Sequence, residues 1–255
     1  MTGPETGPGP QGRRMLFVVG LHRSGTTLLS KLLARHSQVS GLQDTGAPMD
    51  EGQYLQDVIP RIGGVGALAF RKGFHRTEAS PLATPEAARQ LWQAWAPHWN
   101  LEKPVLLEKS PPYITATRLL QYYFPDAAFV LITRHPFAQA MAISKWSANR
   151  PAFQFVTNWL ICHEVFAADS RHLKQSMTIR YEDFCAAPED GLRRICAFAG
   201  LPPEDLLDRE IRSSNAKYFA QWNDPARLRL GRAQTAAIRL AYGRRLARWG
   251  YDTRV

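Results

Sequence analysis

Residues 20–29, Gly-Leu-His-Arg-Ser-Gly-Thr-Thr-Leu-Leu, have the composition of an anion-binding loop. They follow the apolar run 15–19 and lead into a helical pattern through Leu32 and Leu33. Small residues between a buried strand and a helix let backbone N–H groups close around an anion, and the start of the helix adds positive potential. This segment therefore predicts a phosphate-binding loop. The alternative is a strand, turn and helix that contain glycines for structural reasons alone.

The loop departs from the pattern of nucleotide triphosphatases at one position. Gly20 and Gly25 have the P-loop spacing, but Thr26 stands where those enzymes carry the lysine that reaches the outer phosphates. The cation lies inside the loop instead, at Arg23. This arrangement suits a donor with one bridging oxygen to neutralise and no metal to hold.

Residues 23–27, Arg-Ser-Gly-Thr-Thr, resemble the 5′-phosphosulfate loop of sulfotransferases that use 3′-phosphoadenosine 5′-phosphosulfate (PAPS). The match is nearer to the tyrosylprotein and bacterial branch than to the cytosolic enzymes that act on phenols and steroids. The resemblance covers residues 15–222 and implies a P-loop-like sulfotransferase fold, that is, a single α/β domain with a central parallel sheet flanked by helices. It also implies in-line transfer of a sulfuryl group from PAPS to a hydroxyl or amine, release of 3′,5′-adenosine bisphosphate, and no metal.

In this family the loop holds the 5′ end of the donor, and the resemblance implies the same here. Arg23 is expected to act in catalysis by neutralising the leaving phosphate. Backbone N–H groups and the hydroxyls of Thr26 and Thr27 are expected to bind the 5′-phosphate. The expected donor-binding residues of the loop are His22, Arg23, Ser24, Gly25, Thr26, Thr27 and Leu28.

A second catalytic cation is expected at Lys109. It follows the apolar run 105–107, and Glu-Lys-Ser-Pro at residues 108–111 resembles the family's Lys-x-Pro strand end. A parallel strand that ends in charge delivers that charge to the carboxyl edge of the sheet, where ligands bind in α/β folds. A surface lysine at a strand end is the structural alternative.

The other end of the donor nucleotide is expected near Arg134, which follows the apolar run 128–133. A guanidinium at a strand end can bind a phosphate monoester with two hydrogen bonds, and the resemblance assigns it the 3′-phosphate. The family places a serine eight residues later, but Ala142 occupies that position and Ser144 is the nearest hydroxyl. Lys217 lies in a segment that loosely resembles the family's late nucleotide-covering segment.

The base that accepts the acceptor's proton is expected to be a carboxylate. Cytosolic sulfotransferases carry a catalytic histidine two residues after the strand-end lysine, and this chain has Pro111 there. In the tyrosylprotein type the base is a glutamate in the loop after the second strand, and the matching position here is Asp44. Glu51 and His75 are the alternative bases, and a turn or capping role is the structural alternative for Asp44.

Alternation of apolar runs with helical periodicity predicts the elements that position these residues. Strands are expected at residues 15–19, 38–42, 105–109, 128–133 and 177–181. Helices are expected at residues 85–99, 113–124, 136–146, 158–173 and 188–199. Strands that end in charge and lead into helices favour a parallel sheet with its active edge at the carboxyl ends.

Two further segments carry structural expectations. The tryptophans at positions 92, 95 and 99 share one helix face with Leu91 and are expected in the core. Arg-Tyr-Glu-Asp at residues 180–183 resembles a segment that ends a central strand in the family, and we expect it to hold the sheet edge through charge pairs.

The chain of 255 residues suffices for one domain, expected at residues 14–255, behind a disordered tail at residues 1–13. Its net charge of +10 indicates anionic partners without choosing among a nucleotide, nucleic acid and a membrane surface. Three cysteines with no close pair indicate neither a disulfide framework nor a zinc site. Because no apolar run suits a membrane span or a signal peptide, we expect a cytoplasmic, bacterial enzyme.

Two other functions compete with sulfuryl transfer. A P-loop kinase or hydrolase needs a loop lysine and an acidic metal ligand, and Thr26 argues against it. A non-enzymatic nucleic-acid-binding protein would use the basic surface and would lose binding steeply with salt. The expected partners are therefore the sulfate-donor nucleotide and an acceptor, either a small molecule, a glycan, a lipid or a peptide, and not nucleic acid. Acceptor choice is expected to lie in residues 46–74 and 146–155.

Overall fold

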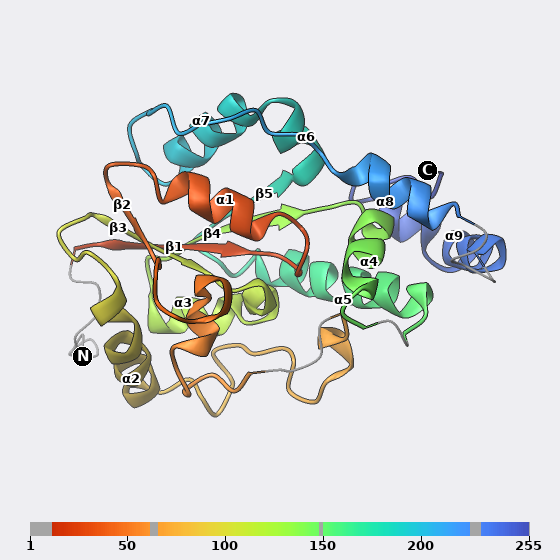
Figure 1. Ribbon diagram of the computed structural model, residues 1–255. Helices are drawn as coiled ribbons and strands as arrows, with labels where there is room; N and C mark the ends of the chain where they lie inside the picture. The colour runs from red at the N-terminus through yellow and green to blue at the C-terminus, as the bar shows by residue number, and fades with distance from the viewer. Residues whose placement is uncertain (1–11, 62–65, 148–149, 225–230, 255) are drawn as a thin grey trace.

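The computed structural model describes residues 12–61, 66–147, 150–224 and 231–254. Its centre is a five-stranded parallel sheet with the strand order β2-β3-β1-β4-β5 (Figure 1). The strands are β1 (Arg14–Val19), β2 (Val39–Gly41), β3 (Val105–Lys109), β4 (Ala128–Thr133) and β5 (Gln175–Arg180). The expected α/β class with a central parallel sheet is confirmed.

Helices cover both faces of the sheet (Figure 1). One face carries α1 (Thr26–Leu33), α6 (Tyr181–Ala186) and α7 (Pro188–Phe198). The other face carries α2 (Pro85–Trp95), α3 (Thr117–Tyr123) and α5 (Ala152–Asp169). Beyond the carboxyl ends of the strands lie α4 (Pro136–Ser144), α8 (Asn215–Trp222) and α9 (Gly231–Ala247). Short 3₁₀ turns occupy Pro48–Asp50, Gly52–Tyr54, Leu68–Phe70, Ala96–His98 and Pro111–Thr115.

The position of β1 between β3 and β4 brings three strand ends together. Val18 is in register with Lys109 on one side and with Val130 on the other. The loop that follows β1 therefore leaves the sheet between Lys109 and the strand end before Arg134. Open α/β sheets bind ligands at such a point, where neighbouring strands connect in opposite directions.

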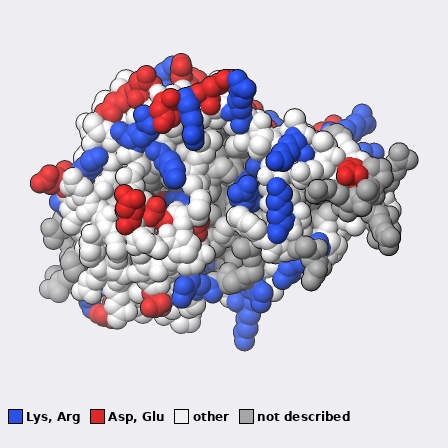
Figure 2. All heavy atoms as spheres, in the orientation of Figure 1, with Lys and Arg blue, Asp and Glu red and all other residues white. Residues whose placement is uncertain are grey.

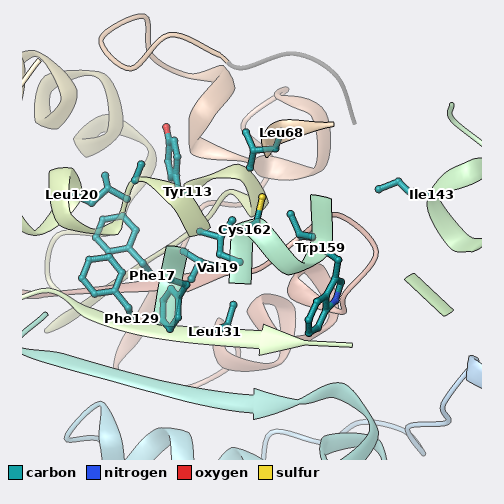
Figure 3. Packing of buried hydrophobic residues seen from close by; sticks show 14 of the residues in the cluster. Phe17, Val19, Leu68, Tyr113, Leu120, Phe129, Leu131, Ile143, Trp159 and Cys162 are labelled. Carbon is teal, nitrogen blue, oxygen red and sulfur yellow. The ribbon is translucent and has the colours of Figure 1, made fainter. Parts of the chain in front are cut away.

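Both faces of β1 are buried, which explains its unbroken apolar sequence. Phe17 and Val19 belong to the cluster under α2, α3 and α5, and the rings of Phe17 and Phe129 stack with centroids 5.2 Å apart (Figure 3). Leu16 and Val18 pack in the opposite cluster, with α1, α6 and α7. Each large apolar side chain buried in this way contributes about 1.5–3 kcal/mol. The two clusters together hold the sheet in place beneath the loop.

The tryptophans expected on one helix face are confirmed as core, although α2 ends at Trp95 and Trp99 follows the 3₁₀ turn Ala96–His98. Trp92, Trp95 and Trp99 are all buried. Their indoles also tie loops to the sheet, because Trp95 Nε1 donates to the Gly52 carbonyl at 2.9 Å and Trp99 Nε1 donates to the Leu107 carbonyl at 3.1 Å. A buried indole N–H needs such an acceptor, so the stripe also fixes the segment around Gly52.

The helix expected at residues 113–124 is in fact two elements. Pro111 opens the 3₁₀ turn Pro111–Thr115, and α3 begins only at Thr117. Two consecutive prolines have no N–H to donate, and the Tyr113 N–H bonds the Ser110 carbonyl at 3.0 Å, so the chain turns tightly before an α-helix propagates.

Two other expectations are also wrong in detail. The helix expected at residues 158–173 begins at Ala152 and ends at Asp169, because buried Phe155 and Val156 extend its apolar face toward the N-terminus. β5 is an edge strand and not a central one, since it stands at the end of the strand order. Of the disordered tail expected at residues 1–13, only residues 12–13 lie within the described part of the chain.

Candidate active site

The loop between β1 and α1 packs closely on its neighbours through two glycines. A Cβ atom on Gly20 would lie 2.6 Å from the Ile132 carbonyl oxygen, and one on Gly25 would lie 2.8 Å from the Tyr181 ring. Gly25 also has φ 104°, and Arg23 has φ 71°, both in the left-handed region. The loop thus needs glycine where it touches β4 and α6, and it holds Arg23 in an unusual backbone conformation.

The start of α1 is open to an anion. No side chain caps this helix, and its first turn carries no acidic residue. The first N–H groups of a helix have no acceptor within it, so they are free to bind a negative group. The Ser24 hydroxyl is fully buried and has no hydrogen-bond partner among the described residues. An unsatisfied hydroxyl beside free N–H groups fits a phosphate or sulfate group at this loop.

Lys109 and Glu51 form a buried ion pair on one side of the loop. Lys109 Nζ lies 3.1 Å from Glu51 Oε1, and it also donates to the Met49 carbonyl at 2.9 Å. Both side chains are almost fully buried, with exposed fractions of 4% and 6%. Burial lowers the pKa of His22, while Glu51 raises it and Lys109 lowers it. The structure thus brings together one predicted cation and one alternative base.

Glu108 anchors the segment that carries Glu51. Its Oε1 accepts a hydrogen bond of 3.0 Å from the Gly52 N–H and another from the Ser110 hydroxyl. Its other oxygen has no partner in the described part of the chain. Complete burial raises the pKa of Glu108 to about 8. A protonated Glu108 is therefore the stable form near neutral pH, and it holds the backbone next to Glu51.

Arg23 points to the opposite side of the loop. Its Nη2 donates to the Tyr218 hydroxyl at 3.5 Å, and its guanidinium lies 5.2 Å from the centre of the Trp146 ring. Lys109 instead bonds Glu51 and Met49. Of the two predicted catalytic cations, Lys109 thus lies on the β3 side of the loop, and the side chain of Arg23 extends from the loop toward α4 and α8.

Arg134 is a buried connector between these elements. Its Nη1 donates to the Arg23 carbonyl, Nη2 to the Ser214 hydroxyl and Nε to the Asn215 side chain, at 2.9, 2.9 and 2.8 Å. Only 4% of the residue is exposed. Its guanidinium also lies 4.4 Å from the centre of the Tyr181 ring. Arg134 therefore fixes the backbone of the phosphate loop.

Glu182 completes this network at the sheet edge. It accepts hydrogen bonds from the Asn215 amide at 2.6 Å, the His135 N–H at 2.9 Å and the Tyr251 hydroxyl at 3.1 Å. Within the same expected Arg-Tyr-Glu-Asp segment, Arg180 lies 3.8 Å from Asp183. The segment thus holds the edge mainly through hydrogen bonds of Glu182 and only weakly through a charge pair.

Two other predicted site residues bond to groups outside the loop, and a third is exposed. The Ser144 hydroxyl donates to the Met141 carbonyl of its own helix at 2.9 Å. His75 Nε2 pairs with Asp169 at 3.0 Å, at the end of α5. Lys217 is exposed on α8. The structure thus does not bring His75 to the Lys109 pair.

A hollow of about 690 Å³ lies between α1 and the loop after β2. Thr27 and Leu28 line it from α1, Asp44 from the loop, and Lys109 from β3. Asp44 is exposed and has φ 53°. Figure 2 shows Lys and Arg side chains on both sides of a hollow between the surface over α1 and that over α4 and α8. Asp44 and Lys109 therefore line one hollow beside the phosphate loop.

A model of the sulfotransferase family matches residues 16–205. The chain belongs to the sulfotransferase family. The chain is 25% identical over 211 residues to the protein-tyrosine sulfotransferase of Drosophila melanogaster, a match that covers 76% of this chain and 39% of the fly protein. It is 22% identical over 241 residues to the nodulation protein NoeE of Sinorhizobium fredii, across 82% of this chain and 55% of that protein. The chain thus spans only part of the length of these relatives.

Solved structures share the fold of this chain. The sulfotransferase domain of the Synechococcus PCC 7002 olefin synthase aligns with a TM-score of 0.53 and 18% identity, across 89% of this chain and 90% of that chain. A sulfotransferase from Mycobacterium tuberculosis H37Rv aligns with a TM-score of 0.50 and 19% identity, across 82% and 71%. The P-loop-like sulfotransferase fold expected from the sequence is confirmed.

The described residues form no helix with the length and apolarity required to cross a membrane. They also include no group of three or more His, Cys, Asp or Glu side chains that could ligate a metal ion.

Sequence reasoning missed several residues of this site. Tyr218 meets Arg23 across 195 positions of sequence, and Trp146 and Lys145 follow α4 without any motif. Glu108 belongs to the Lys109 motif, which gives it no role of its own. A continuous apolar run that includes one glutamate before the strand's final lysine was the signal for a buried carboxylate.

Proposed function

We propose that this protein transfers a sulfuryl group from PAPS to a hydroxyl or amine of an acceptor. The observation that carries the proposal is the phosphate loop, which combines an uncapped helix start and the buried, unsatisfied Ser24 hydroxyl with Arg23 in place of a P-loop lysine. These groups suit the phosphosulfate end of a nucleotide. When bound, the donor supplies the sulfuryl group and leaves as 3′,5′-adenosine bisphosphate.

In this proposal the loop residues hold the donor's 5′ end. The N–H groups and hydroxyls from His22 to Leu28 bind the phosphate oxygens, and Arg23 neutralises charge there. Lys109 acts from the other side, where a fixed ammonium stabilises the charge that develops on the bridging oxygen. Glu51 holds Lys109 in place through the 3.1 Å contact. Arg134 adds positive potential behind the loop.

We propose Asp44 as the base that accepts the proton of the acceptor. A general base must reach the proton it removes. Asp44 lines the hollow and has no hydrogen bond to another described residue, whereas the two oxygens of Glu51 are engaged by Lys109 and Gln53. The exposed carboxylate is therefore the better placed of the two. His75 is not part of the proposal, because it contacts Asp169 instead.

The hollow also favours a polar acceptor. Charged side chains line it along α1 and beyond, so it offers hydrogen-bond donors and acceptors beside its apolar surface. The charged residues are Lys31, Arg35, Asp44, Asp50, Lys109, Asp208 and Arg209. Such a lining suits a hydroxyl acceptor with further polar groups better than a flat hydrocarbon.

A P-loop kinase or hydrolase is the weaker alternative. Thr26 is buried at the position of the phosphate-binding lysine, so no ammonium reaches the outer phosphates from there. A nucleic-acid-binding function would rest on net charge alone, and no described feature favours it.

The transfer itself can be tested without knowing the acceptor. Purified protein is incubated with radiolabelled sulfate donor and a cell extract from its own source, and labelled products are separated and identified. The proposal expects a labelled product that disappears with Arg23→Ala. A protein that is folded and binds the donor but labels nothing in any fraction would argue against transferase activity.

A further inference from the structure

We propose that the Lys145 ammonium and the Tyr218 hydroxyl bind the 3′-phosphate of the donor nucleotide, with Arg134 supporting them from beneath. This inference rests on the proposed function, since it concerns the second phosphate of the same nucleotide. It assigns the subsite to residues of α8 and of the segment just after α4, in place of the serine that is absent at position 142.

Three cations surround the side chain of Tyr218. Arg23 Nη2 lies 3.5 Å from the hydroxyl, Lys145 Nζ lies 5.6 Å from the ring centre, and the Arg134 guanidinium lies 5.1 Å from it. Within the described ranges, neither Lys145 nor Arg23 pairs with a carboxylate. Like charges this close repel one another unless an anion joins them. The cluster therefore has the charge of an incomplete phosphate site.

The Tyr218 hydroxyl is suited to donate to that anion. Burial raises the pKa of Tyr218, but the hydrogen bond from Arg23 and the charges of Arg23, Lys145 and Arg134 outweigh this and leave the pKa lowered. A more acidic phenol is a stronger hydrogen-bond donor to phosphate oxygens. The same cations that attract the phosphate thus also strengthen the hydroxyl that would bind it.

The residues expected from the family pattern are less well placed. Ala142 has no hydroxyl and is buried, and the Ser144 hydroxyl is turned to the Met141 carbonyl. Arg134 already donates to Arg23, Ser214 and Asn215, and it is almost fully buried. Its guanidinium therefore backs the Tyr218 ring and positions the loop, while the exposed Lys145 remains free to meet a ligand.

Packing between α4 and α8 keeps the two binding residues together. The rings of Phe137 on α4 and Trp222 on α8 stack with centroids 4.0 Å apart and an interplanar angle of 6°. Lys145 directly follows the last residue of α4, and Tyr218 lies within α8. The subsite is thus formed by two packed helices and needs no rearrangement of the sheet.

The test compares two nucleotides that differ by the 3′-phosphate. Binding of 3′,5′-adenosine bisphosphate and of adenosine 5′-monophosphate is measured by calorimetry, with EDTA present. Lys145→Ala and Tyr218→Phe should each weaken bisphosphate binding by about tenfold or more, the usual loss for a hydrogen bond to a charged group, and should change monophosphate binding by less than about twofold. Lys72→Ala and Tyr122→Phe, at exposed positions away from the site, should change neither.

The outcomes separate the subsite from the proposed function. If folded wild-type protein binds neither nucleotide, the proposed function fails, and the subsite fails with it. If wild-type protein prefers the bisphosphate and both variants keep that preference, the assignment of Lys145 and Tyr218 is overturned while the proposed function stands. A variant that weakens both nucleotides equally also overturns it, because the effect would not depend on the 3′-phosphate.

Discussion

The Arg134 guanidinium donates a hydrogen bond of 2.9 Å to the backbone carbonyl of Arg23, across 111 positions of sequence. This contact ties the strand end of β4 to the phosphate loop at the residue with φ 71°. A left-handed residue other than glycine costs about 1–2 kcal/mol and persists only where its surroundings hold it. Arg134 is therefore one of the groups that keep the loop in its anion-binding shape.

Arg134→Lys should weaken the binding of both the bisphosphate and the monophosphate nucleotide by about tenfold or more. One ammonium cannot replace the three hydrogen bonds that the planar guanidinium donates. Calorimetry gives both affinities, and a melting curve checks the fold. Arg212→Lys, at an exposed position, serves as the matched control. Loss confined to the bisphosphate would show that Arg134 acts on the 3′-phosphate directly and not through the loop.

Lys109→Met should lower turnover by about 10²-fold or more while leaving bisphosphate affinity nearly unchanged, since the ammonium acts mainly on charge that develops during transfer. Methionine keeps the length of the buried side chain. The measurement is the rate of label transfer to the identified product, with Lys72→Met as control. A variant that transfers label at the wild-type rate would remove Lys109 from the mechanism.

Asp44→Asn should reduce turnover by about 10²–10⁴-fold, the range for removal of a general base, without loss of donor binding. Glu51→Gln should reduce it less, since the amide can still accept a hydrogen bond from Lys109. The two rates are compared in one assay with the same acceptor. If Glu51→Gln is the more damaging change and Asp44→Asn is nearly silent, the roles of the two carboxylates are reversed.

Glu108 should make stability fall as pH rises. Its side chain loses its proton near pH 4.5 in the unfolded chain but only near pH 8 when folded, because burial raises its pKa to about 8. The folded state therefore binds more protons than the unfolded chain between these values. The contribution of Glu108 to the free energy of unfolding is thus lost as the pH rises from 5 to 8. Glu108→Gln should be more stable relative to wild type at pH 8 than at pH 5, by on the order of a few kcal/mol.

Urea unfolding at the two pH values measures this difference, and Glu102→Gln at an exposed position provides the control. A stability difference between Glu108→Gln and wild type that is the same at both pH values would contradict the raised pKa of Glu108.

The loop and the strand ends could be predicted from the sequence because their signals are local. Apolar runs stop at Gly20, at Glu108 and at Arg134, and parallel strands bring their ends to one edge. The small residues of the loop likewise mark a close approach of backbone to an anion. The sequence was thus enough to place Lys109 and Arg134 at the same sheet edge as the loop, whereas their positions on either side of it follow from the strand order of the structure.

Contacts between distant segments could not be predicted in this way. The partners of Arg134 include Asn215, 81 positions away, and Glu108 holds Gly52, 56 positions away. Tertiary packing decides whether a strand-end arginine faces a ligand or turns into a network of the protein's own oxygens. The prolines at positions 111 and 112 indicate a break in the helix from local sequence. Where the next helix begins depends also on the hydrogen bond from the Tyr113 N–H to the Ser110 carbonyl.

The most direct test of the account is a calorimetric titration of the purified protein with 3′,5′-adenosine bisphosphate in EDTA, alongside Arg23→Ala. We expect saturable binding of one nucleotide per chain without any divalent metal, and a loss of about tenfold or more in affinity when the loop guanidinium is removed. A folded protein that binds no bisphosphate in EDTA, but hydrolyses ATP when Mg²⁺ is added, would contradict it.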